Sequence, residues 1–474
     1  MLVNWRGLYR KFLLKSLSEN CFVFLLILLS SGVVNAQRNC LTISVSNPGQ
    51  IKVDAKLATP GRSWSFRNAY AGVLGIAKRV DDFRAITSSG QDAGARKIAT
   101  GEFRSELDAT RITYKVRLSE INAASVSHVS WLTTDYGVLM LADLLPQDFT
   151  NFSIDFELPA GWQVESSNTR PDENAVFLVG RSLRKTSTSI EQMPLDLVVS
   201  DTWKFKDSAA LNAAGKVLKK YLTLTGFKLP GRSTIMIAPL PVAVGSTKWR
   251  AETRGSTVLL LIDPAANFTN WTGQLGVIFT HELLHLWVPN SLHLDGDYDW
   301  FFEGFTLYTA LRTALELKII NFKEYLDTLA RVYDSYLSYP DDLSLIDASE
   351  RRWTTPGSFV YDKGMLAAFL YDLQIRTASG GKISLADKYR ELFARHDTDH
   401  VNANEAIIAV LGSSPAAKDF TKSYIENSMR LEFERLLPAY GLTLDSSGSS
   451  SQLRVSRGLS SDQKRLLRSL GFRD

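Results

Sequence analysis

Cysteine, histidine and excess charge are all scarce in this chain, and each scarcity limits what the protein can be. Its 474 residues include 2 cysteines and 6 histidines. Cys21 lies in a segment that we expect to be removed, and Cys40 alone cannot form an internal disulfide, so stability must come from the core and any bound metal. The net charge of +4 falls to +1 without residues 1–36, which hold 4 basic residues and 1 acidic residue. This balance does not favour nucleic acid as a partner.

The apolar run in the N-terminal segment is shorter than the roughly 20 residues that a membrane-spanning helix needs. Four basic residues precede an apolar run from Cys21 to Leu29, and Val34-Asn35-Ala36 offers small residues at both positions that determine cleavage. The pattern predicts a secretory signal peptide cut after Ala36, export to the periplasm or the medium, and no stable membrane anchor after cleavage. An uncleaved anchor is the competing interpretation. The sequence does not predict an oligomeric state.

Alternating apolar and polar runs dominate the first part of the chain. Thr113–Leu118 and Phe152–Leu158 are typical of strands, and the second run ends at Pro159. After about residue 200 the pattern predicts a helix over 209–224, strands over 234–238 and 256–262, and then long helices to about residue 442. We therefore expect an α+β multidomain fold with a signal peptide at 1–36, a β-rich N-terminal domain at 37–200, a mixed domain at 201–330, a helical C-terminal domain at 331–445 and a flexible tail at 446–474.

Two of the histidines have the spacing of metal ligands. They form His281-Glu282-x-x-His285, within a segment predicted to be helical from Thr272 to Pro289. Four residues advance an α-helix by about 400°, so the two imidazoles project from nearly one face and can converge on one zinc ion. A lone histidine on an apolar helix is usually a satisfied core residue, but burying this trio without a cation would be costly.

A third protein ligand must come from elsewhere, which leaves the fourth zinc position for water. Glu303 is the stronger candidate, because it follows His285 by a stretch of 17 residues and opens a predicted helix over 300–317. His293 is the rival, although it lies on irregular backbone after Pro289. Glu282 lies beside the open position, where a carboxylate can act as general base.

Several separated motifs occur in the order known from one peptidase family. They are His281-Glu-Leu-Leu-His-Leu-Trp287, Glu303-Gly-Phe-Thr306, Tyr361-Asp-Lys-Gly-Met-Leu366 and the segment 373–385. Over roughly residues 150–445 the chain resembles the glycyl aminopeptidase family of zinc metallopeptidases, in the gluzincin clan and related to aminopeptidase N. The resemblance implies a β-rich N-terminal domain, a thermolysin-like catalytic domain at 201–330, a helical C-terminal domain and Zn²⁺ as cofactor.

The resemblance also implies two further site residues. Tyr361 stands where relatives carry a tyrosine that donates to the oxyanion formed at the peptide carbonyl. Glu252 stands where relatives carry a glutamate that binds the substrate α-ammonium. Here Arg250 replaces a glycine of that motif and Thr253 replaces a histidine, which places strict aminopeptidase action in question.

The sequence therefore predicts a zinc metallopeptidase that acts on peptides or proteins and releases residues from the amino terminus. Two alternatives stay open at this point. One is an endopeptidase with the same site, and the other is a catalytically idle, exported scaffold that binds peptides.

Overall fold

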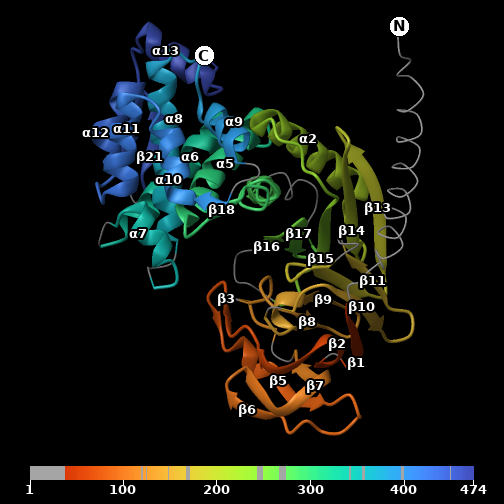
Figure 1. The fold of residues 1–474 in the computed structure, drawn as a ribbon. Coiled ribbons are helices and arrows are strands. Elements are labelled where there is room, and N and C mark those ends of the chain that lie inside the picture. The colour runs from red at the N-terminus through yellow and green to blue at the C-terminus, as the bar shows by residue number, and fades with distance from the viewer. Residues whose placement is uncertain are drawn as a thin grey trace, which may run out of the picture.

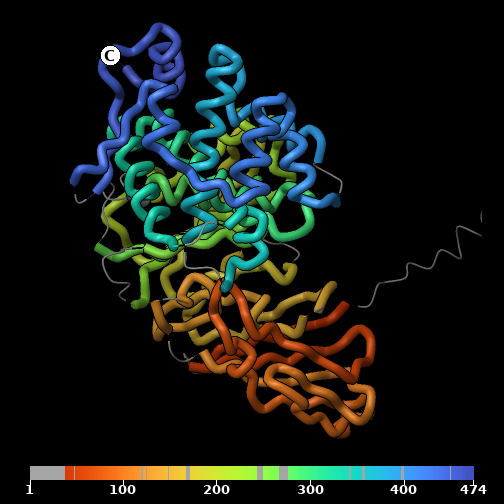
Figure 2. Tube along the Cα trace, turned by 90° about the vertical axis from the view of Figure 1, so that its left-hand side faces the viewer, coloured from red at the N-terminus to blue at the C-terminus, as the bar shows by residue number. Residues whose placement is uncertain are grey.

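The computed structural model describes residues 38–47, 49–118, 121–123, 125–147, 149–166, 171–242, 249–265, 274–340, 343–354, 358–396, 400–448 and 450–473. The expected signal peptide and Thr272 lie outside these residues. Strands fill the first part of the chain and helices the second, with the β-rich part below the helices in Figure 1 and again in the rotated view of Figure 2. This arrangement confirms the α+β multidomain class. No helix in the described part of the chain is long and apolar enough to cross a membrane.

The first sheet has six strands in the order β10-β1-β2-β7-β5, with β6 paired to β7. Its strands β1 and β10 are parallel, and the other pairs are antiparallel. The two strands expected in this region are present in β7 and β10. The bounds are β1 Asn39–Asn47, β2 Gln50–Ser65, β5 Val80–Ile86, β6 Arg96–Ala99, β7 Glu102–Arg117 and β10 Phe152–Glu157.

A second, four-stranded sheet lies between the first sheet and a third sheet of five strands (Figure 1). Its order is β11-β12-β9-β8, and all pairs are antiparallel. A short hairpin of β3 and β4 also leaves the N-terminal part. The bounds are β3 Ala69–Tyr70, β4 Val73–Leu74, β8 Trp131–Leu132, β9 Tyr136–Met140, β11 Gln163–Ser166 and β12 Val176–Gly180.

The third sheet, with the order β13-β14-β15-β17-β16, supports the candidate site. Its central strands β14 (Met193–Ser200), β15 (Ser233–Pro239) and β17 (Thr257–Ile262) are parallel, while β13 (Leu183–Ile190) and β16 (Trp249–Arg254) are antiparallel edge strands. The helix α2 (Asp207–Thr225) connects β14 to β15. The domain boundary expected at residue 200 thus falls inside this sheet, because its first two strands precede the change in sequence pattern.

Helices pack against this sheet and against one another around one continuous apolar core that extends from Met193 to Leu470. The division expected at residue 330 therefore separates segments that share a core. Local signals explain individual boundaries: Asn321 and Glu324 form a capping box at the start of α6. The bounds are α4 Gln274–Leu284, α5 Thr306–Glu316, α6 Phe322–Leu337, α7 Leu345–Glu350, α8 Phe359–Ala378, α9 Leu385–His396, α10 Ala403–Leu411, α11 Pro415–Thr421, α12 Phe433–Leu436 and α13 Ser461–Ser469, with short strands β18 Leu294–Asp295, β19 Val401–Asn402, β20 Leu442–Asp445 and β21 Gln452–Val455.

The segment 446–474, expected to be a flexible tail, contains a strand and a helix within the residues that the structure describes. The serine-rich stretch is the turn between β20 and β21, and the following α13 begins with a capping box of Ser460 and Gln463. Leu467 and Leu470 are fully buried, and Arg312 of α5 donates to the Leu470 carbonyl oxygen. The polar composition of this segment predicted a linker, because composition does not show that its few leucines lie on one face of a helix.

We expect Leu467→Ala to lower the free energy of unfolding by about 2–5 kcal/mol, the usual cost of emptying a buried leucine site. Chemical denaturation of the purified protein measures the change. The matched control is Arg465→Ala on the exposed face of α13, which should stay within about 0.5 kcal/mol of the parent protein. Equal free energies of unfolding for the two variants would show that α13 is only loosely attached to the core.

Candidate metal centre and catalytic cleft

The two spaced histidines lie at the C-terminal end of a buried helix. His281 is in the last turn of α4, and His285 follows immediately after it, with its backbone N–H shared between the carbonyl oxygens of His281 (3.3 Å) and Glu282 (3.2 Å). The regular helix thus ends at Leu284, earlier than Pro289. The imidazoles nevertheless stay on one face, and their Nε2 atoms lie 3.1 Å apart.

Glu303 enters the site from a π-helical turn, Trp300–Phe305, which leads directly into α5. The sequence predicted one regular helix over this region, with Glu303 in its first turn. Wider turns of this kind are frequent at functional sites, because they re-aim side chains within a helix. Here the turn places Glu303 Oε2 3.4 Å from the Nε2 atoms of both His281 and His285.

Two glycines let this turn approach α8 closely. A Cβ atom at Gly304 would lie 2.5 Å from the Cα atom of Gly364, and a Cβ atom at Gly364 would lie 2.7 Å from the carbonyl oxygen of Trp300. Any larger residue at either position would push the two elements apart. The close packing brings Tyr361, near the start of α8, to Glu303, and its hydroxyl donates to Glu303 Oε1 at 3.0 Å.

The three side chains fit a zinc ion. Ligands about 2.0–2.1 Å from a tetrahedral zinc ion lie roughly 3.3–3.4 Å from one another, close to the observed separations of 3.1, 3.4 and 3.4 Å between the donor atoms of His281, His285 and Glu303. Although burial opposes its charge, contact with the two imidazoles holds the pKa of Glu303 well below its usual range. The carboxylate is therefore ionised and suited to a cation.

Hydrogen bonds on the far side of each imidazole leave the Nε2 atoms available. His285 Nδ1 lies 2.8 Å from the carbonyl oxygen of Val288, which can only accept. His281 Nδ1 lies 3.4 Å from the hydroxyl oxygen of Thr306, whose own proton goes to the Phe302 carbonyl oxygen at 2.6 Å. These partners allow each Nδ1 to carry a proton, so that each Nε2 can present its lone pair when a metal ion binds.

Glu282 is buried beside this group and is oriented by Thr253, the residue that replaces the histidine of the related motif. The Thr253 hydroxyl of β16 lies 2.8 Å from Glu282 Oε2 and 2.9 Å from the Glu282 carbonyl oxygen. Burial raises the pKa of Glu282, against the attraction of the two imidazoles. A higher pKa makes the carboxylate a better proton acceptor.

Glu252 also faces the cleft, but it already has partners. Its Oε1 accepts from the Tyr70 hydroxyl at 2.9 Å and from Arg254 Nε at 2.6 Å, and its Oε2 contacts His128 Nδ1. The side chains of Glu252 and Arg254 are only 10% and 4% exposed. Arg250 donates to the Ala123 carbonyl oxygen instead of lining the cleft. Any substrate ammonium at Glu252 would therefore share the carboxylate with an arginine.

The rival ligand His293 does not join the site. It is exposed, and its ring is 5.3 Å from that of His400. The structure does add Arg352, which follows α7 and contacts both Glu303 and Tyr361. No sequence motif marked this arginine, because it is close to the metal ligands only after α7 and α8 have packed.

A cleft of about 800 Å³ opens over these residues. The N-terminal part contributes Tyr70 and His128 to its wall, and the sheet, α4, the π-helical turn, α5, α8 and the segment after α7 contribute further residues. This shape can hold a peptide against the candidate ligands.

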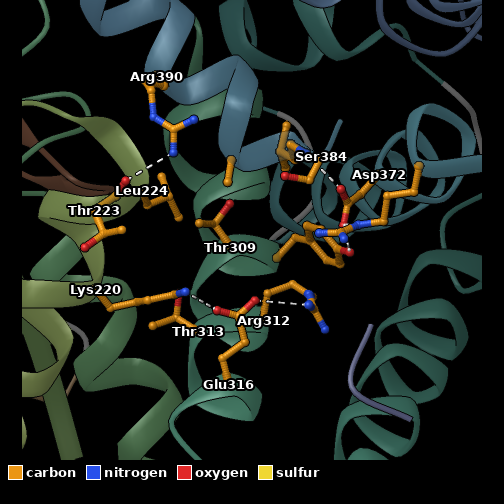
Figure 3. A pocket seen from close by; sticks show the side chains of 14 residues that line it. Lys220, Thr223, Leu224, Thr309, Arg312, Thr313, Glu316, Asp372, Ser384 and Arg390 are labelled. Atoms are coloured by element: carbon orange, nitrogen blue, oxygen red, sulfur yellow. Dashed lines mark hydrogen bonds and ion pairs between the residues drawn. The ribbon is translucent and has the colours of Figure 1, made fainter. Parts of the chain in front are cut away.

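A second cavity of about 210 Å³ lies where α2, α5, α8 and α9 meet (Figure 3). Its charges are compensated internally: Lys220 and Arg312 contact Glu316 at 2.5 and 3.1 Å, and Arg376 contacts Asp372 at 2.9 Å. The three candidate ligands are not among its lining residues. The larger cleft is therefore the better place for chemistry.

Solved structures with a similar fold include an aminopeptidase N family protein and M1 zinc metallopeptidases. No family model matches the chain, and no curated protein matches it. An aminopeptidase N family protein from Idiomarina loihiensis has a TM-score of 0.74 at 18% identity and covers 90% of this chain and 82% of its own. A mutant M1 zinc metallopeptidase from Deinococcus radiodurans, bound to a Tyr-Ser-Ala substrate, has a TM-score of 0.58 at 13% identity. The match covers 84% of this chain and 95% of that protein. The chain thus has the fold of aminopeptidase N-like gluzincins.

Proposed function

We propose that this protein is a zinc-dependent peptidase that hydrolyses peptide bonds near the amino terminus of its substrates. The observation that carries the proposal is the set of three donor atoms at tetrahedral separations on the floor of a peptide-sized cleft. His281, His285 and Glu303 would hold the ion, which when bound would acidify a water molecule and polarise the scissile carbonyl.

The remaining chemistry falls to the chain's own residues. Glu282 accepts the proton of the attacking water and returns it to the leaving amine nitrogen, while the Thr253 hydroxyl holds the carboxylate in place. Tyr361 donates to the oxyanion that forms on the substrate carbonyl. Burial, and then the charge of Glu303, raise the pKa of Tyr361 well above its usual value, so its hydroxyl keeps the proton that it must donate.

The position of cleavage depends on the wall that contains Glu252. Its carboxylate supports recognition of a free α-ammonium, because a charge-assisted hydrogen bond there would anchor the substrate terminus. Its pairing with Arg254 favours instead the second candidate, an endopeptidase that ignores the terminus. Retention of all three donors and of Glu282 argues against an idle scaffold. Export remains a prediction from the basic and apolar N-terminal segment.

We expect peptides with a free amino terminus to be cut at least about tenfold faster than N-acetylated forms of the same sequence, the size of one charge-assisted hydrogen bond. A peptide library digested with and without a zinc chelator, and read by mass spectrometry, gives both the rates and the positions of the cuts. Glu252→Gln should reduce the preference without changing the rate on acetylated peptides. Equal rates on both forms would select the endopeptidase, and no chelator-sensitive cleavage would reject the peptidase itself.

A further inference from the structure

Arg352 is placed among the residues of the candidate metal centre. Its Nη2 donates to Glu303 Oε1 at 3.1 Å and contacts the Tyr361 hydroxyl oxygen, while its Nη1 contacts Asp299. The side chain is 16% exposed. One guanidinium thus joins a candidate ligand to the candidate oxyanion donor, with a second carboxylate as its anchor.

Packing as well as hydrogen bonding holds the guanidinium in this position. Its Cζ lies 4.9 Å from the ring centroid of Trp353 and 5.1 Å from that of Tyr361. Asp299 is buried, and its contact with Arg352 offsets the cost of that burial. Because a guanidinium is a planar fork with fixed donor directions, anchoring Nη1 on Asp299 also fixes the direction of Nη2.

These contacts give the two carboxylate oxygens of Glu303 different partners. Oε1 accepts from Arg352 and from Tyr361, whereas Oε2 faces His281 and His285. A carboxylate without such partners can rotate or bind a metal through both oxygens. Outer hydrogen-bond partners of this kind typically change metal affinity or activity by about 10–100-fold when they are removed.

Catalysis would make the contact of Arg352 with Glu303 more important. The Tyr361 hydroxyl has one proton, and in the resting site it goes to Glu303 Oε1. When Tyr361 turns that proton to the substrate oxyanion, Glu303 Oε1 loses a donor. Arg352 remains to hold it, and its positive charge beside the tyrosine oxygen strengthens the hydroxyl as a donor.

We propose that Arg352 is a positioning residue that fixes Glu303 as a one-oxygen zinc ligand and keeps it fixed while Tyr361 serves the oxyanion. This proposal rests on the proposed function. A purely electrostatic role makes the opposite prediction for metal binding, because removing one cation beside Glu303 would by charge alone favour Zn²⁺. The direction of the change in zinc affinity therefore distinguishes the two roles.

The test compares Arg352→Met and Arg352→Lys with Arg351→Met, a matched change at the exposed neighbouring arginine. Zinc affinity is measured by competition with a chromophoric chelator, and kcat and KM are measured at saturating zinc. We expect Arg352→Met to bind zinc about 10–100-fold more weakly and to lose about tenfold or more in kcat with little change in KM. Arg351→Met should match the parent protein.

Arg352→Lys keeps the test decisive if the methionine variant does not fold. Lysine retains the positive charge between Asp299 and Glu303 but lacks the fork, so its melting temperature should stay near that of the parent while its zinc affinity falls. Unchanged or tighter zinc binding in either folded variant overturns the positioning role. Failure of the parent protein to bind zinc or cut peptides would instead overturn the proposed function.

Discussion

Replacing Glu282 by glutamine should lower kcat by about 10²–10⁴-fold while leaving the zinc content unchanged. That range is the usual contribution of a positioned general base. The substitution preserves the size of the side chain and its hydrogen bond with Thr253, but an amide cannot accept the proton of the attacking water. Glu282 is not one of the three donor residues, so its replacement leaves the set of zinc ligands unchanged.

The burial of Glu282 explains why the effect should be so large. The side chain is buried, its carboxylate accepts a hydrogen bond from the Thr253 hydroxyl, and burial raises its pKa. Few other groups can therefore take over the proton transfer in the same place. Zinc content by elemental analysis and kcat on a free-amine peptide are the two measurements. Glu432→Gln, an exposed glutamate change far along the chain, is the matched control. Near-normal kcat in folded, zinc-loaded Glu282→Gln would require another base.

Local sequence patterns were sufficient to predict the central part of the site. The spacing of His281 and His285 on one helix is a property of a few consecutive residues, and the structure places their Nε2 atoms together. The predicted helix over 209–224 and the strands over 234–238 and 256–262 correspond to α2, β15 and β17. Periodicity over such short segments already contains the information that defines these elements.

Contacts between distant segments could not be predicted in the same way. Arg352 reaches Glu303 because α7, which precedes it, packs against the π-helical turn, and Glu252 receives Tyr70 and His128 from the N-terminal part of the chain. Thr253 looked like the loss of a histidine, although its hydroxyl contacts Glu282. Each of these roles depends on tertiary packing rather than on a local motif.

The secondary structure around the expected domain boundaries also depends on packing. A change of sequence pattern near residue 200 marks where helices begin, but the five-stranded sheet already starts at β13. The serine-rich stretch after residue 445 resembled a linker, although it only turns the chain between β20 and β21. Composition reports average polarity, and packing is decided by which particular side chains share a face.

Replacing His285 by alanine should reduce the metal content from about one zinc ion per chain to almost none, and peptide hydrolysis should fall with it. Two protein donors would remain, whereas catalytic zinc sites ordinarily use three. Glu303 Oε2 would also lose a partner at 3.4 Å, and the His281 Nε2 atom would lose its neighbour at 3.1 Å.

The matched control is His293→Ala, which removes the imidazole that the sequence offered as an alternative ligand. This histidine is exposed and faces His400, so its loss should leave zinc content and kcat near those of the parent protein. Elemental analysis after dialysis against metal-free buffer measures the first quantity, and added zinc tests whether activity can be restored. Full zinc content in His285→Ala, or loss of zinc in His293→Ala, would move the metal centre away from the end of α4. The expected contrast between the two variants therefore depends on where each imidazole lies in the fold, because both substitutions remove the same chemical group.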